Sequence, residues 1–314
     1  MADISPLTSL LSQMVAPSFF ALLLLAALGA AMLAALYHLA GTAKGKVFHE
    51  LTARQLCSLA WPQLVLALAA GVAGFWSTWA RLPWIGRRLL DGPGLPFGVA
   101  DLVVGLCCLI VAGAWTKLAQ KKGLRLALCL LGGLAAPVAV YLLVALAKDF
   151  TSAWMSGGQA VIAAHTLYLP GPHALFWPTL AAGLFLALAD GAGLGLGWML
   201  IRRNRDDFGR DYYNQSLPKL ALWGALAGLA HLACQGWLLL VLDPPLYALA
   251  TKTALGVIWL AGGAALLLGS LCRLVLARSK APLRLKGVAY LALVLDWAGH
   301  AFIVTTLAAL APLS

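Results

Sequence analysis

The sequence predicts an all-α integral membrane protein with eight transmembrane helices. Of the 314 residues, 62% are hydrophobic and only 11% are charged, whereas soluble domains are roughly 45–50% apolar and about 25% charged. Eight apolar stretches each approach or exceed the roughly 20 residues that a helical span needs. Lys and Arg residues concentrate in alternate connections between these stretches. These three observations together favour a multi-pass protein of the lipid bilayer.

The spans are expected to be helices because lipid satisfies no backbone hydrogen bond. The residues before the first span lack a basic region and include Asp3, which favours a short interfacial segment over a cleaved signal peptide. The predicted spans cover residues 17–40, 56–79, 98–118, 124–147, 174–201, 218–241, 250–273 and 287–311.

The distribution of basic residues predicts the orientation of the chain. The connections after spans one, three, five and seven hold 17 of the 22 Lys and Arg residues, with Arg273 counted among them at the end of span seven. Basic residues favour the cytoplasmic side, so both termini are expected outside. The net charge of +11 is therefore explained by topology, and no nucleic-acid partner is expected.

An offset of 164 residues relates the first four spans to the last four. Residues 45–49 (GKVFH) align with residues 209–213 (GRDYY), and Leu56 aligns with Leu220. Such self-similarity is typical of an internal repeat. We therefore predict two four-helix bundles, residues 1–148 and 174–314, joined by an outer loop of residues 149–173.

Two histidines within predicted spans are the main candidates for chemistry. His231 and His300 each lie 13 residues from the cytoplasmic end of their spans, which at 1.5 Å per residue is roughly 20 Å. An ionisable residue at this depth is costly and indicates a functional site. On diagonal helices of one bundle, the two imidazoles would face each other and could hold the iron of haem b from both sides.

The neighbouring residues are consistent with such a site. Gln235 and Asp296 each share a helix face with one histidine, and Asp296 is expected to orient His300. Asp190 lies at similar depth among glycines that allow close packing or leave room for a flat macrocycle. Three interpretations remain open, namely a bis-histidine haem, a quinone or proton site, and a structural polar cluster.

Three further residues are candidates for a quinone site. His165 and His173 lie on the outer side, where an imidazole can take up and release a proton, although both could simply be exposed loop residues. Asp101 lies near the outer end of span three. His38 and His49, in contrast, are expected to be solvated or interfacial at the cytoplasmic end, and the six cysteines to be small core residues.

This pattern of spans, outer termini and candidate quinol residues resembles the membrane subunits of bacterial respiratory complexes, such as the polysulfide-reductase and dimethyl-sulfoxide-reductase anchors. Residues 22–59, with the GKVF turn and the following Arg54-Gln55, are similar to the opening helices of cytochrome bd oxidase subunit I, although that family's haem-ligating histidine near the start of the first helix has no counterpart here. The resemblance implies a place in the bacterial cytoplasmic (inner) membrane beside other redox subunits.

The expected function is that of a membrane-embedded electron-transfer subunit. It would exchange electrons between quinone or quinol and a partner redox protein on the outer (periplasmic) side, through haem b if the histidine pair binds it, and any enzymatic activity would belong to the complex. Two alternatives remain, a proton-coupled transporter or permease that uses Asp190 and Asp296, and a cofactor-free anchor subunit.

Overall fold

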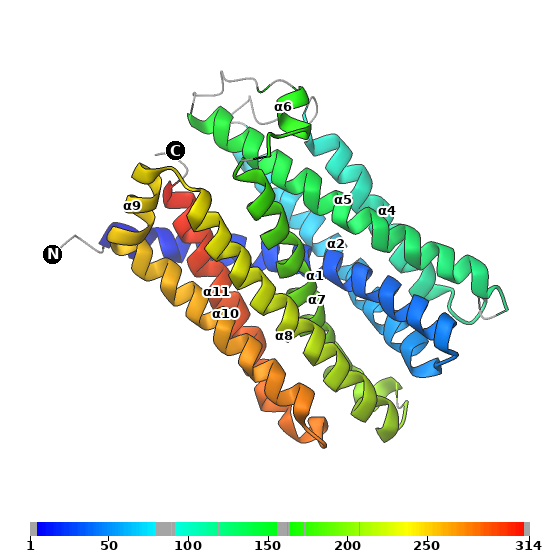
Figure 1. Ribbon diagram of the computed structural model, residues 1–314. Helices are drawn as coiled ribbons and strands as arrows, with labels where there is room; N and C mark the ends of the chain where they lie inside the picture. The colour runs from blue at the N-terminus through cyan, green and yellow to red at the C-terminus, as the bar shows by residue number, and fades with distance from the viewer. Residues whose placement is uncertain are drawn as a thin grey trace.

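The computed structural model describes residues 5–79, 89, 92–118, 120–155, 162, 164–172, 174–206 and 208–310. These residues form helices and turns, and no strand occurs among them. Eight of their helices are long and apolar enough to cross a membrane. The prediction of an all-α chain with eight candidate spans is therefore confirmed (Figure 1).

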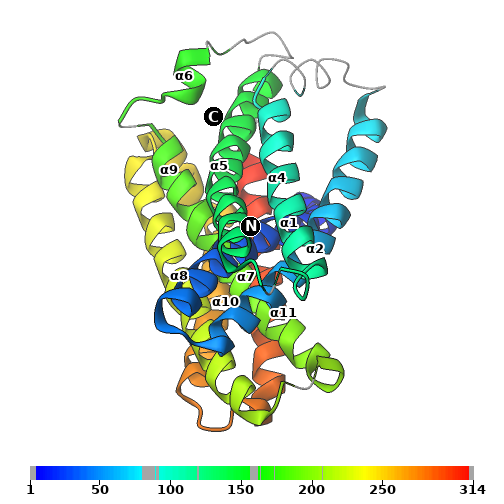
Figure 2. The same cartoon turned by 90° about the vertical axis from the view of Figure 1, so that its right-hand side faces the viewer.

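Most ends of the long helices extend beyond the predicted spans, because the helical conformation continues into neighbouring polar residues. Their bounds are α1 (Ser5–Lys44), α2 (Val47–Trp79), α4 (Gly94–Gly113), α5 (Lys122–Met155), α7 (Phe176–Asp206), α8 (Arg210–Val241), α10 (Ala254–Arg278) and α11 (Lys286–Leu310). Short helices occupy three connections, namely α6 (Ala164–Tyr168), α9 (Pro244–Lys252) and η1 (Pro282–Leu285). In both views α6 and α9 lie at one end of the molecule and η1 at the other (Figures 1 and 2).

The seventh predicted span differs from the structure at its start. Residues 250–252 belong to α9, which begins with Pro244 and Pro245 in its first turn, where proline is well tolerated. The Thr253 side chain then accepts a hydrogen bond from the Leu255 amide, at 3.2 Å, and caps α10. The spanning helix therefore begins at Ala254.

Helix α1 lies in the middle of the packing, in contact with α2, α5, α7 and α11. Its closest approach is to α7, where Gly29 and Gly191 face the opposing backbone. A Cβ atom at Gly29 would overlap the carbonyl oxygen of Ala187, and one at Gly191 would overlap the backbone of Ala30 and Gly29. Small residues at these positions therefore allow the two helices to touch.

Several structural features repeat at the offset of 164 residues. Among the described residues, the glycines with positive φ are Gly45 and Gly209, at 62° and 82°, a conformation that favours glycine. Residues at equivalent positions also contact each other across the molecule. The rings of Phe48 and Tyr212 lie 5.9 Å apart, and the hydroxyl oxygens of Thr52 and Ser216 lie 3.1 Å apart.

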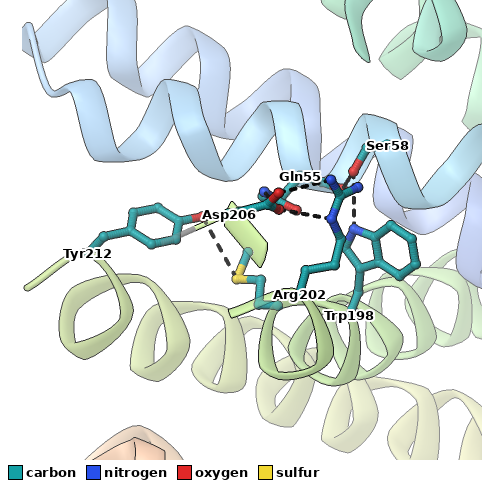
Figure 3. A network of polar contacts seen from close by, with 7 residues as sticks. Gln55, Ser58, Trp198, Arg202, Asp206 and Tyr212 are labelled. Atoms are coloured by element: carbon teal, nitrogen blue, oxygen red, sulfur yellow. Dashed lines mark hydrogen bonds and ion pairs between the residues drawn. The ribbon is translucent and has the colours of Figure 1, made fainter. Parts of the chain in front are cut away.

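A polar network near these contacts joins α2 to α7 (Figure 3). The Gln55 amide donates to the Asp206 carboxylate at 2.7 Å, and Asp206 also pairs with Arg202 at 2.8 Å. One turn along, the indole of Trp198 donates to the Ser58 hydroxyl at 3.0 Å. These bonds fix α2 against the end of α7.

Candidate functional site

A cluster of buried charges lies among α7, α10 and α11. Arg273 forms an ion pair with Asp296, and their side chains are only 1% and 3% exposed. Beside them the Nε2 atom of His300 lies 2.9 Å from a carboxylate oxygen of Asp190, and this pair is equally buried. Arg273 also interacts electrostatically with Asp190, so the four side chains form one charged group.

Glycines on α7 and α8 make room for the Arg273 side chain. A Cβ atom at Gly193 would lie 2.7 Å from a guanidinium nitrogen of Arg273, and one at Gly224 would lie 2.9 Å from its Cδ. The sequence analysis counts Arg273 with a cytoplasmic connection, but it lies within α10 and is buried. The sequence does indicate this burial, because Arg273 lies within the apolar run of span seven. Other helices carry small residues that can leave room for its side chain.

His231 is hydrogen-bonded to two other groups and interacts electrostatically with His300 and Asp190. Its Nδ1 atom lies 2.9 Å from the carbonyl oxygen of Ala182, so Nδ1 carries the proton and donates. Its Nε2 atom then accepts from the Gln235 amide at 3.3 Å. Gln235 and His231 therefore lie on one helix face and in contact, and the contact fixes a neutral tautomer.

The structure gives the two histidines different protein contacts. His231 contacts α7 at Ala182 and His300 contacts it at Asp190, about two turns further along, and His231 still interacts electrostatically with His300 and Asp190. In addition, the Nε2 atom of His300 faces the Asp190 carboxylate, while Asp296, the expected partner of His300, pairs with Arg273.

The charges of the cluster suit one bound proton. Two carboxylates and one guanidinium carry one excess negative charge when the imidazoles are neutral. Asp190 Oδ2 and His300 Nε2 are close, yet neither makes a well-aligned hydrogen bond to any described residue. A single proton shared by Asp190 and His300 would neutralise the group, which is strongly favoured at membrane depth.

A pocket of about 620 Å³ lies between α2 and α4. Its described lining is almost entirely apolar and includes Trp61, Leu64 and Phe97, with Asp101 as the ionisable residue. The Asp101 Oδ1 atom is buried and has no hydrogen-bond partner within the described parts of the chain. An unpartnered carboxylate beside an apolar cavity suits a ligand that is mostly hydrophobic but carries a hydrogen-bond donor.

The other two quinone candidates are not brought to this pocket. His165 lies exposed on α6, which packs against α5, and it does not line the pocket. His173 lies outside the described residues. Of the three candidates, Asp101 alone is shown beside a cavity in the described part of the chain.

The sequence interpretation missed a second buried cluster, which joins α1, α2 and α5. His38 was expected to be solvated or interfacial, but it is fully buried. Arg125 donates from Nε to His38 Nε2 at 3.1 Å, pairs with Glu50, and lies 4.1 Å from the centre of the Trp115 ring. The position of Arg125 beside an apolar run could have indicated its burial. Its partners Glu50 and His38, however, lie 75 and 87 residues away along the chain.

Comparison with known proteins found no family model that matches the chain and no similar sequence among curated proteins.

Proposed function

We propose that the chain is a quinone-binding subunit of a redox complex in the bacterial inner membrane, with the quinone headgroup in the α2–α4 pocket. The observation that carries this proposal is a large apolar pocket with one unpartnered carboxylate, Asp101. Ligand pockets usually measure about 300–1,000 Å³ and combine apolar walls with a few polar groups. The volume of about 620 Å³ falls within that range.

The position of the pocket suits a ligand that arrives through the lipid. Its lining includes side chains that are more than half exposed on the outside of the helices, such as Val65, Leu68 and Leu102. Lipid would cover these surfaces in a membrane, so an isoprenoid tail can enter between α2 and α4. Asp101 lies seven residues into α4, about 10 Å from the helix start, and would meet the headgroup near the membrane boundary.

The chemistry assigned to Asp101 is proton exchange with the headgroup. A quinol hydroxyl would donate a hydrogen bond to the Asp101 carboxylate. As the quinol loses two electrons to a partner redox protein, Asp101 would accept one of its two protons. The second proton would leave to water at the outer surface. Reduction of a quinone would follow the reverse order.

The proposal includes two four-helix bundles with both termini outside. Helices α1, α2, α4 and α5 contact one another in a ring, as do α7, α8, α10 and α11. The repeated glycine turns at Gly45 and Gly209 support the same division. The pocket would then belong to the first bundle and the charged cluster to the second.

A substitution in the pocket is expected to weaken quinone binding. Gly98 lines the pocket, and a Cβ atom at Gly98 would meet open space, so Gly98→Leu should fill part of the cavity without strain. We expect its Kd for decyl-ubiquinone to rise at least tenfold, about 1.4 kcal/mol, as measured by equilibrium dialysis in lipid nanodiscs. Asp101→Leu should have a similar effect because the headgroup loses its polar partner.

Gly236→Leu is the matched control. Gly236 is also helical, exposed and open to a Cβ atom, but it lies on α8 away from the pocket. Its Kd should stay within twofold of the unmodified protein. Equal Kd values for Gly98→Leu and Gly236→Leu would contradict a quinone site between α2 and α4.

Proton-coupled transport is the second candidate function, favoured by the buried Asp190–His300 pair. A site that holds one proton at mid-membrane is what such a transporter needs. In that case, liposomes containing the protein should take up protons under a potassium diffusion potential, and Asp190→Asn should abolish the uptake. Asp211→Asn, an exposed residue at the start of α8, is the control. Absence of potential-driven proton uptake by the unmodified protein would count against this candidate.

A further inference from the structure

A smaller pocket of about 320 Å³ lies where the end of α1 and the start of α2 meet α8. Its polar end is formed by Tyr37, His49 and Lys219, and its floor by Leu36, Leu222, Trp223 and Leu226. The pocket is lined by residues from both repeats. It shares no lining residue with the larger pocket, which contains Asp101.

Positive charge gathers at the polar end. His49 and Lys219 each interact electrostatically with Lys44 and Lys46. The ion pairs found among the described residues include none of these four side chains. The three lysines carry like charges that repel one another without a counter-ion, and a bound anion would relieve the repulsion.

A buried hydroxyl adds a hydrogen-bonding group at the same place. Tyr37 lines the pocket, is only 4% exposed, and its hydroxyl has no hydrogen-bond partner in the described structure. Its ring lies 5.6 Å from that of His49. Buried hydroxyl groups normally find a partner, and a phosphate oxygen beside Lys219 would provide one through a charge-assisted bond.

The floor of the pocket extends from the charged end along the outside of α8. Lys219, Leu222, Trp223 and Leu226 recur at the three- and four-residue spacing of one helix face. The last three are 42–53% exposed, and the stripe from Lys219 to Leu226 is about 10 Å long. An apolar stripe that starts at a basic group matches a molecule with an anionic head and a hydrocarbon chain.

We propose that this pocket binds an anionic phospholipid, with its phosphate at Lys219, His49 and Tyr37 and one acyl chain along Leu222, Trp223 and Leu226. Basic pockets between transmembrane helices on the cytoplasmic side bind such headgroups in other membrane proteins. The lipid would bridge α1 and α2 of the first repeat to α8 of the second. The proposal needs the chain to span a membrane, and it does not depend on quinone binding.

The test is lipid binding to the purified full chain in detergent, followed by native mass spectrometry and by thermal unfolding. Dioleoyl phosphatidylglycerol should bind and raise the midpoint of unfolding, whereas dioleoyl phosphatidylcholine should do neither at the same concentration. Lys219→Ala should weaken phosphatidylglycerol binding about fivefold, since one basic group near the surface contributes about that factor. Tyr37→Phe, which removes only the hydroxyl, should weaken binding at least twofold.

Lys280→Ala is the control, because Lys280 is exposed in the connection between α10 and η1 and does not line the pocket. Its affinity for phosphatidylglycerol should be unchanged. Equal binding of the two lipids, or equal loss in Lys219→Ala and Lys280→Ala, would overturn the proposal. Displacement of phosphatidylglycerol by millimolar inorganic phosphate or glycerol phosphate would also overturn it, since the site would then recognise a free anion.

Discussion

Replacing Arg273 with methionine is expected to destabilise the folded protein by about 3–5 kcal/mol. The substitution keeps an unbranched apolar stem but removes the charged guanidinium group. Two buried carboxylates, Asp296 and Asp190, would then lose their cation, and breaking a buried ion pair at one partner typically costs this much. Unfolding in detergent, followed by circular dichroism, measures the change.

Two further variants test whether the loss of stability is specific to the buried ion pair. Arg278→Met removes an exposed arginine from the same helix and should change stability by less than about 1 kcal/mol. Combining Arg273→Met with Asp296→Leu should recover at least half of the loss, because the pair is then removed together. Equal stabilities for Arg273→Met and Arg278→Met would show that Arg273 is not held in the buried cluster.

Gly29→Ala is expected to destabilise the protein by about 1–3 kcal/mol, the usual cost of overpacking a close-packed contact. The added methyl group would overlap the Ala187 carbonyl oxygen, and a backbone atom cannot move aside as a flexible side chain can. Helices α1 and α7 would have to separate along their whole contact. Thermal unfolding of the variant in detergent tests this expectation.

Gly236→Ala is the control, because it is expected to change stability in the opposite direction. A Cβ atom at Gly236 meets open space, so alanine there should stabilise the helix by roughly 0.5–1 kcal/mol through its better helix propensity. Opposite signs for the two substitutions are expected. Stabilisation by Gly29→Ala would contradict the close approach of α1 and α7.

The eight spans could be predicted because membrane helices must be long and continuously apolar. Their ends could not, because a helix can continue into polar and charged residues beyond the bilayer, so the drop in hydropathy does not mark where the helix ends. Helices α8 and α11 show the difference. His231 and His300 are equally far from the predicted span starts, but α8 begins at Arg210 and α11 at Lys286, so the two histidines lie 21 and 14 residues from their helix starts.

The membership of the charged cluster could be predicted in part. His300, Asp190 and Asp296 stand out as ionisable residues within apolar helices, and the structure places all three in one buried group with Arg273. Which acid meets which base depends on the rotation of α7 and α11 about their axes, and no local pattern records it. Arg273 itself was hidden among topology charges because it lies only five residues from the end of α10.

Asp101 was recognisable as an acid near the end of a span, but the pocket beside it was not. A cavity forms where two helices diverge, and the spacing of α2 and α4 is set by their packing on other helices. Glycines such as Gly98 and Gly105 line the pocket. Glycines are also common where helices pack closely, so they do not identify a cavity in the sequence. The sequence therefore identifies the carboxylate, and the three-dimensional structure supplies its ligand-sized space.

Photolabelling with an azido-quinone most directly tests the central claim that the α2–α4 pocket binds quinone. The protein in lipid nanodiscs is irradiated with the probe, digested and mapped by mass spectrometry, with excess decyl-ubiquinone as competitor. We expect competitor-sensitive labels on residues 61–72 of α2 and 97–109 of α4, which line the pocket, and their loss in Gly98→Leu. Specific labelling confined to α7, α8, α10 or α11, or no labelling that the competitor suppresses, would contradict it.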